Sequence, residues 1–79
     1  MSGSWWPMLS PLDARVLRAT DAFDVRRIDR VAWLAGCSEE LAASSLRRLR
    51  RSLLVEPDGS RPTGWLRTHR GEVAWEHTP

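Results

Sequence analysis

The 79-residue sequence contains no lysine and only one cysteine, Cys37. All 12 basic residues are therefore arginines, and the formal net charge is only +2. A single cysteine excludes a disulfide within the chain. No apolar run approaches the roughly 20 residues that a membrane-spanning helix needs, and no signal peptide is recognisable. We therefore expect a soluble protein without a membrane partner, located in the cytoplasm of a bacterium or of a phage-infected host.

The residues that carry most enzymatic and metal chemistry are also scarce. Cys37, His69 and His77 are too few and too scattered for a zinc site, and Cys37 is expected to be a small buried thiol. No glycine-rich phosphate loop, pair of catalytic carboxylates or nucleophile with a neighbouring base is found. Ser44 and Ser45 lack a histidine in register, and one of the two is expected in the core. We expect no catalytic residue, metal or cofactor.

The length indicates one small domain, preceded by a short arm. A chain of this size buries only roughly 60 to 65% of its unfolded surface, so dimerisation is an available source of stability. Residues 1–9 form the arm, which contains Trp5 and Trp6, and residues 10–79 form the domain. Each tryptophan can bury on the order of 200 Å², so we expect the arm to pack on its own domain or on a second subunit. The alternative is a frayed tail.

A first helix is predicted from Ser10. This serine can cap the helix, Pro11 suits the first helical position, and Asp13 in the first turn favours the helix dipole. Its apolar stripe is expected to extend to Phe23. Asp24 is then expected to cap the second helix.

Residues 28–55 indicate a helix, a tight turn and another helix. Gly36 can adopt the positive φ that ends the first of these helices, and Ser38 can cap the next one, which is expected over residues 38–52. Apolar residues occupy one face of this last helix, and arginines lie largely around the others. Such a helix suits a polyanion. The arginine cluster consists of Arg47, Arg48, Arg50 and Arg51.

The remaining residues predict a β-hairpin and a short final helix. A stretch rich in proline, aspartate and glycine at residues 57–64 separates two short β-like runs, which is typical of a hairpin with a long tip. Arg61 lies at that tip, and residues 69–77 are expected to add a helical turn or two. The predicted fold is mainly α, with a three-helix core, a two-stranded hairpin and a short C-terminal helix.

Several short motifs accompany this order of elements. They are Val-Ala at 31–32, Gly-Cys-Ser at 36–38, Leu-Arg-Arg-Leu at 46–49, Leu-Val at 54–55 and Leu-Arg-Thr-His-Arg-Gly at 66–71. Together they resemble the winged helix-turn-helix domain of MarR-like bacterial regulators, over roughly residues 10–75. The resemblance implies that helix 38–52 enters the major groove of double-stranded DNA and that the wing, residues 56–64, contacts the backbone.

The resemblance also implies a set of DNA contacts. Glu40 can accept a hydrogen bond from a cytosine amino group, and the arginines can neutralise phosphates or, from the wing, reach a minor groove. The alternatives are a solvated helix face for each arginine and, for Glu39 and Glu40, a favourable interaction with the helix N-terminus. The implied DNA contacts are Arg26, Arg27, Glu40, Ala43, Ser44, Arg47, Arg48, Arg51, Arg61 and Arg67.

Several residues depart from the family's pattern. The positions expected to meet bases carry Glu39, Glu40, Ala43 and Ser44, with Leu41 nearby, where a typical DNA-reading helix carries Arg, Ser, Thr, Asn or Gln. Leu53 stands where the family commonly has glycine, so we expect a differently shaped end of the third helix. Trp33 and Leu34 occupy positions that are normally polar, and an exposed apolar pair indicates a partner. Either the second helix is rotated, or the arm covers the pair, or the pair belongs to a homodimer or hetero-partner interface, together with Trp5 and Trp6.

Two functions are therefore considered. The first is a small dimeric DNA-binding protein, either a transcriptional regulator or an accessory factor of a phage or mobile element. The second is a protein-interaction module that has the winged-helix fold and binds a host or regulatory protein instead of DNA.

Overall fold

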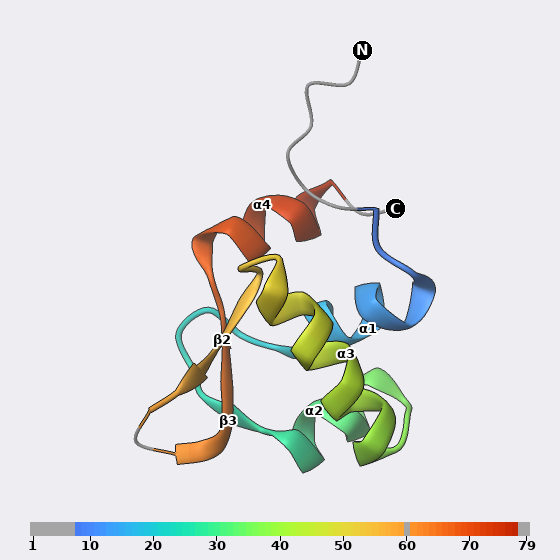
Figure 1. The fold of residues 1–79 in the computed structure, drawn as a ribbon, viewed down its shortest axis with the longest axis vertical. Coiled ribbons are helices and arrows are strands. Elements are labelled where there is room, and N and C mark those ends of the chain that lie inside the picture. Colours follow the sequence, from blue (N-terminus) through green and yellow to red (C-terminus); the bar gives the residue numbers. More distant parts are fainter. Residues whose placement is uncertain (1–7, 60, 78–79) are drawn as a thin grey trace.

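The computed structural model describes residues 8–59 and 61–77, and for residues 61–63 it describes the backbone alone. This part of the chain is mainly helical, with a small antiparallel sheet (Figure 1). The predicted order of three helices, a hairpin and a final helix is confirmed. The elements are α1 (Pro11–Ala19), β1 (Arg26–Arg27), α2 (Ile28–Ala35), α3 (Glu39–Arg51), β2 (Val55–Asp58), β3 (Arg61–Arg67) and α4 (His69–Glu76).

The sheet has a third strand that the sequence did not predict. Its order is β1-β3-β2, and both pairings are antiparallel, so the expected two-stranded hairpin was incomplete. Strand β1 has only two residues, Arg26 and Arg27, which is too short to show an alternating pattern. On the other side of β3, a register shift lies between Pro57 and Asp58. Proline suits this edge strand because it has no N–H to donate.

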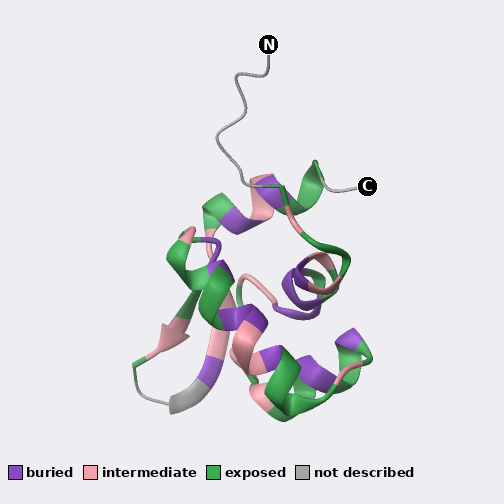
Figure 2. Cartoon of the chain, turned by 45° about the vertical axis from the view of Figure 1, so that its right-hand side comes forward, coloured by how far each residue is buried: buried purple, intermediate pink, exposed green. Residues whose placement is uncertain are grey.

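The core lies where α1, α2 and α3 meet, and β2 and α4 close it. Buried residues alternate with exposed residues along the helices, as Figure 2 shows for α3. Cys37, expected to be buried, is partly buried against this core, as is Leu9 from the end of the arm. The core cluster consists of Val16, Leu17, Ala19, Val31, Ala35, Leu46, Leu49, Leu54, Val55 and Ala74.

Hydroxyl side chains cap three of the helices. The Ser10 hydroxyl accepts the Asp13 N–H at 3.1 Å, and the Ser38 hydroxyl accepts the Leu41 N–H at 3.2 Å, as predicted. Thr68 caps α4 in the same way. Each cap satisfies one of the backbone N–H groups that have no partner inside the helix.

Two expectations for the segment between α1 and α2 were wrong. Helix α1 ends at Ala19, so Phe23 is not part of its stripe and is 97% exposed. Asp24 does not cap α2, because Arg27 holds the cap position and makes no side-chain cap bond. Instead the Asp21 carboxylate accepts the N–H groups of Phe23 and Asp24, both at 2.9 Å. This local turn competes successfully with continuation of the helix.

Helices α2 and α3 end in the same backbone motif but with different residues. Gly36 follows α2 with φ of 71°, and Leu53 follows α3 with φ of 62°. Each is the left-handed residue of a Schellman motif, in which two N–H groups bond back to carbonyls near the helix end. A leucine pays a steric cost in this conformation that glycine avoids. The expectation that Leu53 changes the shape of this helix end was therefore wrong, because Leu53 adopts the same left-handed conformation as Gly36.

Gly71 permits a close approach between α4 and the end of α3. A Cβ atom at this position would lie 2.0 Å from the Leu54 carbonyl oxygen, so no other residue fits without a shift of the backbone. The Thr68 hydroxyl donates to the Leu53 carbonyl at 2.6 Å and accepts the Gly71 N–H at 2.9 Å. The threonine and glycine of the Leu-x-Thr-x-x-Gly motif therefore join the hairpin's end to the core.

Candidate nucleic-acid interface

The amino-terminal half of α3 presents acidic and apolar side chains to solvent. Glu39, Glu40 and Leu41 are exposed, whereas Ala43 and Ser44 are half-buried. These positions are the ones expected to face bases. Both glutamates lie in the first turn of α3, where a negative charge interacts favourably with the helix dipole. This half of the helix therefore adds no positive charge to the surface.

The carboxyl-terminal half of α3 carries a cationic face. Arg47, Arg50 and Arg51 are exposed and line one open cleft of about 360 Å³. Their spacing of three and four residues places them on neighbouring turns of one helix face. Arg47 donates to the Ser44 hydroxyl at 3.3 Å. Within the described ranges, the guanidinium groups of Arg50 and Arg51 make no hydrogen bond or ion pair, so they are available to an anion.

Arg48 differs from its three neighbours because it is bonded to α1. Its Nη2 lies 2.8 Å from Oδ1 of Asp13, and its Nε lies 3.2 Å from Oδ2 of the same carboxylate. Such a two-point pairing matches the planar geometry of guanidinium and carboxylate. The Ser45 hydroxyl, fully buried as expected for one of the two serines, donates to Asp13 at 2.6 Å. Arg48 therefore ties α3 to α1.

The environment of Asp13 has two opposing effects on its acidity. Burial raises the pKa of Asp13, because water no longer stabilises the charged form. Hydrogen bonds from Arg48 and Ser45, and the positive charge of Arg48, lower the pKa by more, so it lies below its ordinary value of 3.8. The same contacts raise the pKa of Arg48. The carboxylate is thus charged and paired over the physiological range.

Arg67, expected in the DNA interface, instead lies inside the protein. Its side chain is 11% exposed, and its Nε lies 2.5 Å from Oε1 of Glu72. Its Nη1 donates to the carbonyls of Leu17 at 3.1 Å and Thr20 at 2.9 Å. The guanidinium carbon also lies 5.3 Å from the centre of the Trp75 ring, a cation–π distance. These contacts hold the Arg67 side chain inside the protein, away from a phosphate on the surface, and we leave it out of the interface.

The arginines near the start of α2 divide in a similar way. Arg26 donates to the Ala19 carbonyl at 2.8 Å, and its Nη2 lies 3.9 Å from Asp21. Arg27 is 69% exposed, and its distance of 3.8 Å to Asp29 indicates only a loose ion pair. Arg27 can therefore still reach a phosphate, whereas Arg26 is held beside the end of α1 by one of its terminal nitrogens.

The remaining wing residue and the arm cannot be placed. The backbone of Arg61 belongs to β3, but its side chain lies outside the described part of the structure. Trp5 and Trp6 lie outside the described residues altogether. Their expected roles in the wing and in the arm stay predictions.

Trp33 and Leu34 form an exposed apolar pair on α2. Trp33 is 72% exposed and Leu34 is 41% exposed, while Val31, Ala32 and Ala35 face the core. Helix α2 is therefore not rotated to bury the pair, which removes one of the alternatives. The Arg30 guanidinium lies 5.1 Å from the centre of the Trp33 ring, so one cation borders the pair.

The buried role of Asp13 was not predicted, although the sequence contains a signal for it. Asp13 lies three, four and seven residues before Val16, Leu17 and Thr20, all of them buried. That spacing places a carboxylate on the inner face of a helix, where a charge needs a partner. The partner itself comes from α3, 35 positions along the chain, and no local pattern identifies it.

Comparison of the chain with protein-family models, with curated proteins and with solved structures found no significant match. Among the described residues, no helix is long and apolar enough to cross a membrane.

Proposed function

We propose that the chain is a small winged helix-turn-helix protein that binds double-stranded DNA. The order of its elements, the tight turn between α2 and α3, and the hairpin beside them support this proposal. The observation that carries it is the face formed by Arg47, Arg50 and Arg51, which lie together around one open cleft. Three exposed guanidinium groups on adjoining helical turns suit the regularly spaced phosphates of a duplex.

In the proposed complex, α3 lies along the major groove and its two halves act differently. The arginines of the carboxyl-terminal half contact the backbone, and Arg27 adds a contact from the start of α2. Phosphate contacts of this kind position a protein without reading sequence. Glu40 is the residue placed to read a base, since its carboxylate can accept a cytosine amino group. We expect affinity to come mostly from phosphate contacts, with modest sequence preference, and we propose a role in regulating transcription.

The salt dependence of duplex binding tests the proposal. Four phosphate contacts, from Arg27, Arg47, Arg50 and Arg51, predict a slope of about −3.6 for the logarithm of the binding constant against the logarithm of salt concentration. Fluorescence anisotropy of a labelled 20-base-pair duplex measures this slope. The double variant Arg50→Gln with Arg51→Gln is expected to reduce the slope to about −1.8.

A matched control uses an arginine on another face. Arg15→Gln removes the same charge from α1, so it should leave the slope of the salt dependence unchanged. Two results would refute the proposed interface. The first is that the wild-type chain does not bind the duplex at low salt. The second is that Arg15→Gln reduces the salt slope as much as the α3 variants do.

A second candidate function follows from Trp33, whose 72% exposure is large for a tryptophan. In this alternative, the chain is a protein-interaction module in which Trp33 and Leu34 contact a partner or a second copy of the chain. Sedimentation equilibrium of the wild-type chain and of Trp33→Ala tests self-association. A wild-type dimer that Trp33→Ala converts to a monomer supports a contact between two copies of the chain through this pair. If the wild-type chain is a monomer, the partner in this alternative must be a different protein.

A further inference from the structure

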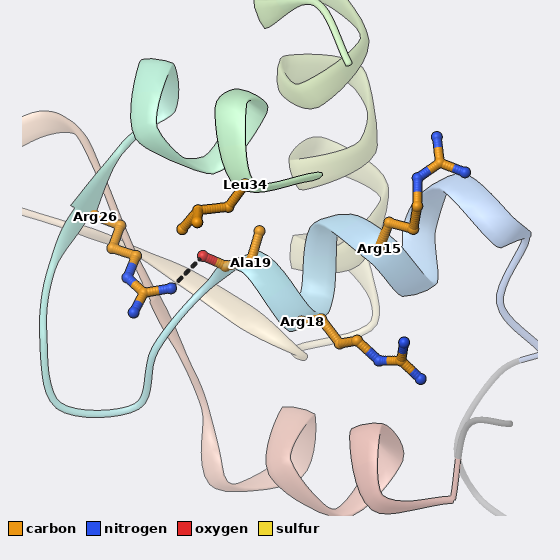
Figure 3. Close-up of a pocket in the computed structure, with 5 residues that line it drawn as sticks. All are labelled: Arg15, Arg18, Ala19, Arg26 and Leu34. Atoms are coloured by element: carbon orange, nitrogen blue, oxygen red, sulfur yellow. Dashed lines mark hydrogen bonds between the residues drawn. The ribbon is translucent and has the colours of Figure 1, made fainter. Parts of the chain in front are cut away.

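A second hollow lies between α1 and α2, separate from the arginine cleft of α3. It has a volume of about 330 Å³. Figure 3 shows the stems of Arg15 and Arg18 leaving α1 on one side, Leu34 entering from α2, and Arg26 on the other side. Its described lining residues, Arg15, Arg18, Ala19, Arg26 and Leu34, include none from α3. A ligand here would not compete directly for the α3 face.

Two of these arginines are held in place by the ends of helices. Nε of Arg15 donates to the carbonyl of Ala35, the last residue of α2, at 3.0 Å. Nη1 of Arg26 donates to the carbonyl of Ala19, the last residue of α1, at 2.8 Å. Each bond uses one edge of a guanidinium group and fixes its position. Because these guanidinium groups are already ordered, less side-chain entropy is lost when an anion binds them.

Donors remain on both groups after these bonds are made. Within the described residues, the terminal nitrogens of Arg15 make no hydrogen bond. Nη2 of Arg26 lies 3.9 Å from Asp21, which is beyond hydrogen-bond distance. Arg15 and Arg26 thus keep guanidinium donors for a ligand on opposite sides of the hollow. The rim is therefore electropositive.

The floor of the same hollow is apolar. Ala19 is nearly buried, and Leu34 is 41% exposed, so part of the leucine side chain faces the hollow and solvent. The methylene stems of the arginines add further apolar surface. An inorganic anion would use only the rim. A ligand with both a charge and an apolar body would use the rim and the floor together.

We propose that this hollow binds a small organic carboxylate with an apolar body of about six carbon atoms or fewer. Its carboxylate bonds to the guanidinium groups of Arg15 or Arg26, and its apolar body covers Ala19 and Leu34. Planar guanidinium groups pair well with carboxylates, and the volume of the hollow accommodates a molecule of this size. The site is independent of DNA binding, because it shares no lining residue with the α3 cleft.

Titration of the ¹⁵N-labelled chain with hexanoate, followed by NMR, tests the proposal. We expect saturable shifts of the amide signals of Ala19, Leu34 and Ala35, with a dissociation constant on the order of 1 mM. Acetate retains the charge and lacks the apolar body, and hexanamide retains the body and lacks the charge. Each is expected to bind at least roughly fivefold more weakly, because each loses one of the two contributions.

Three variants separate the contributions of the residues. Arg15→Gln removes one charge-assisted contact and should weaken hexanoate binding roughly tenfold. Leu34→Gln places a polar group on an exposed part of the floor, so it should weaken hexanoate binding without unfolding the chain and leave acetate binding unchanged. Arg51→Gln, the matched control on α3, should leave hexanoate binding unchanged.

Three outcomes would overturn the carboxylate site. They are the absence of saturation at about 50 mM hexanoate, well above the expected dissociation constant, equal affinities for hexanoate and acetate, and shifts confined to the α3 arginines. The DNA titration uses Arg50→Gln with Arg51→Gln instead, so failure of either proposal is distinguishable from failure of the other.

Discussion

Two pairs of arginines in this protein have the same chemistry and different roles. Arg48 and Arg67 are bonded to carboxylates and carbonyls of α1 and α4. Arg50 and Arg51 are exposed and make no such bonds within the described part of the chain. The first pair holds elements together, and the second pair is available to a partner. A count of arginines therefore overstates the cationic surface, and the predictions below test this division.

Removing Arg67 is expected to have the largest effect on stability. Arg67→Ala leaves the Glu72 carboxylate without its ion pair and the Thr20 carbonyl without its donor, so the free energy of unfolding should fall by about 3 kcal/mol. Chemical denaturation measures the change. A fall smaller than that of Arg50→Ala would contradict the division between the two pairs.

Removing Asp13 should have the next largest effect. Asp13→Ala leaves the buried Ser45 hydroxyl without its acceptor and Arg48 without its carboxylate. We expect the free energy of unfolding to decrease by about 2 kcal/mol. Asp24→Ala, which removes an exposed carboxylate, serves as the control. Equal denaturation midpoints for the two variants would show that the buried cluster does not stabilise the fold.

Low pH should reduce the stability that the bonds of Asp13 to Ser45 and Arg48 provide. The native pKa of Asp13 lies below its ordinary value of 3.8. The contribution of Asp13 to the free energy of unfolding is therefore complete above pH 3.8 and is lost as the pH falls through the native pKa. The stability difference between the wild-type chain and Asp13→Asn should therefore shrink below pH 3.8. The pKa of Asp21 is also lowered, chiefly by the hydrogen bond from the Phe23 N–H. Asp21 should therefore still make the stability of the Asp13→Asn variant depend on pH. Denaturant titrations between about pH 2.5 and 6 would show the effect, and a constant difference would contradict it.

Leu53→Gly changes the end of the cationic helix without changing any arginine. Leucine is strained at φ of 62°, and its side chain is 63% exposed, so little packing is lost. The free energy of unfolding should increase by about 1 kcal/mol, with DNA binding unchanged. Thermal denaturation measures this gain. The reverse change at α2, Gly36→Leu, should destabilise the protein and serves as the opposite control.

The smallest effect on stability is expected from the removal of Arg50 and Arg51. Arg50→Gln with Arg51→Gln should change the free energy of unfolding by less than about 0.5 kcal/mol, although the same variant should weaken DNA binding. Normal denaturation together with a reduced salt slope would sharpen the contrast with Arg67. Strong destabilisation would place these arginines among the structural ones.

The sequence predicted features that depend on near neighbours in the chain. Ser10 and Ser38 were identified as caps because a cap depends on residues three positions away. Gly36 was predicted to end α2 with a positive φ because it follows an apolar helical stripe. The mainly helical layout followed, because helical periodicity is a local property.

Features that depend on distant residues were not predictable. Strand β1 exists because β3 pairs with it, and nothing within Arg26 and Arg27 indicates a strand. The sequence does not distinguish Arg48 from Arg47, since only the position of Asp13 on α1 decides which of them is paired. Phe23 was placed on a helix because the Asp21 turn that ends the stripe was not recognised. The sequence therefore indicated the arginine cluster of α3, but it did not indicate which arginines are bonded inside the protein.

The bonds from Arg67 to Leu17 and Thr20 join residues about 50 positions apart in a chain of 79. During synthesis, the carboxyl end of α1 therefore cannot bond to Arg67 until β3 has left the ribosome. A nascent chain that ends before β3 contains all three core helices but not this connection, so we expect it to stay loosely packed.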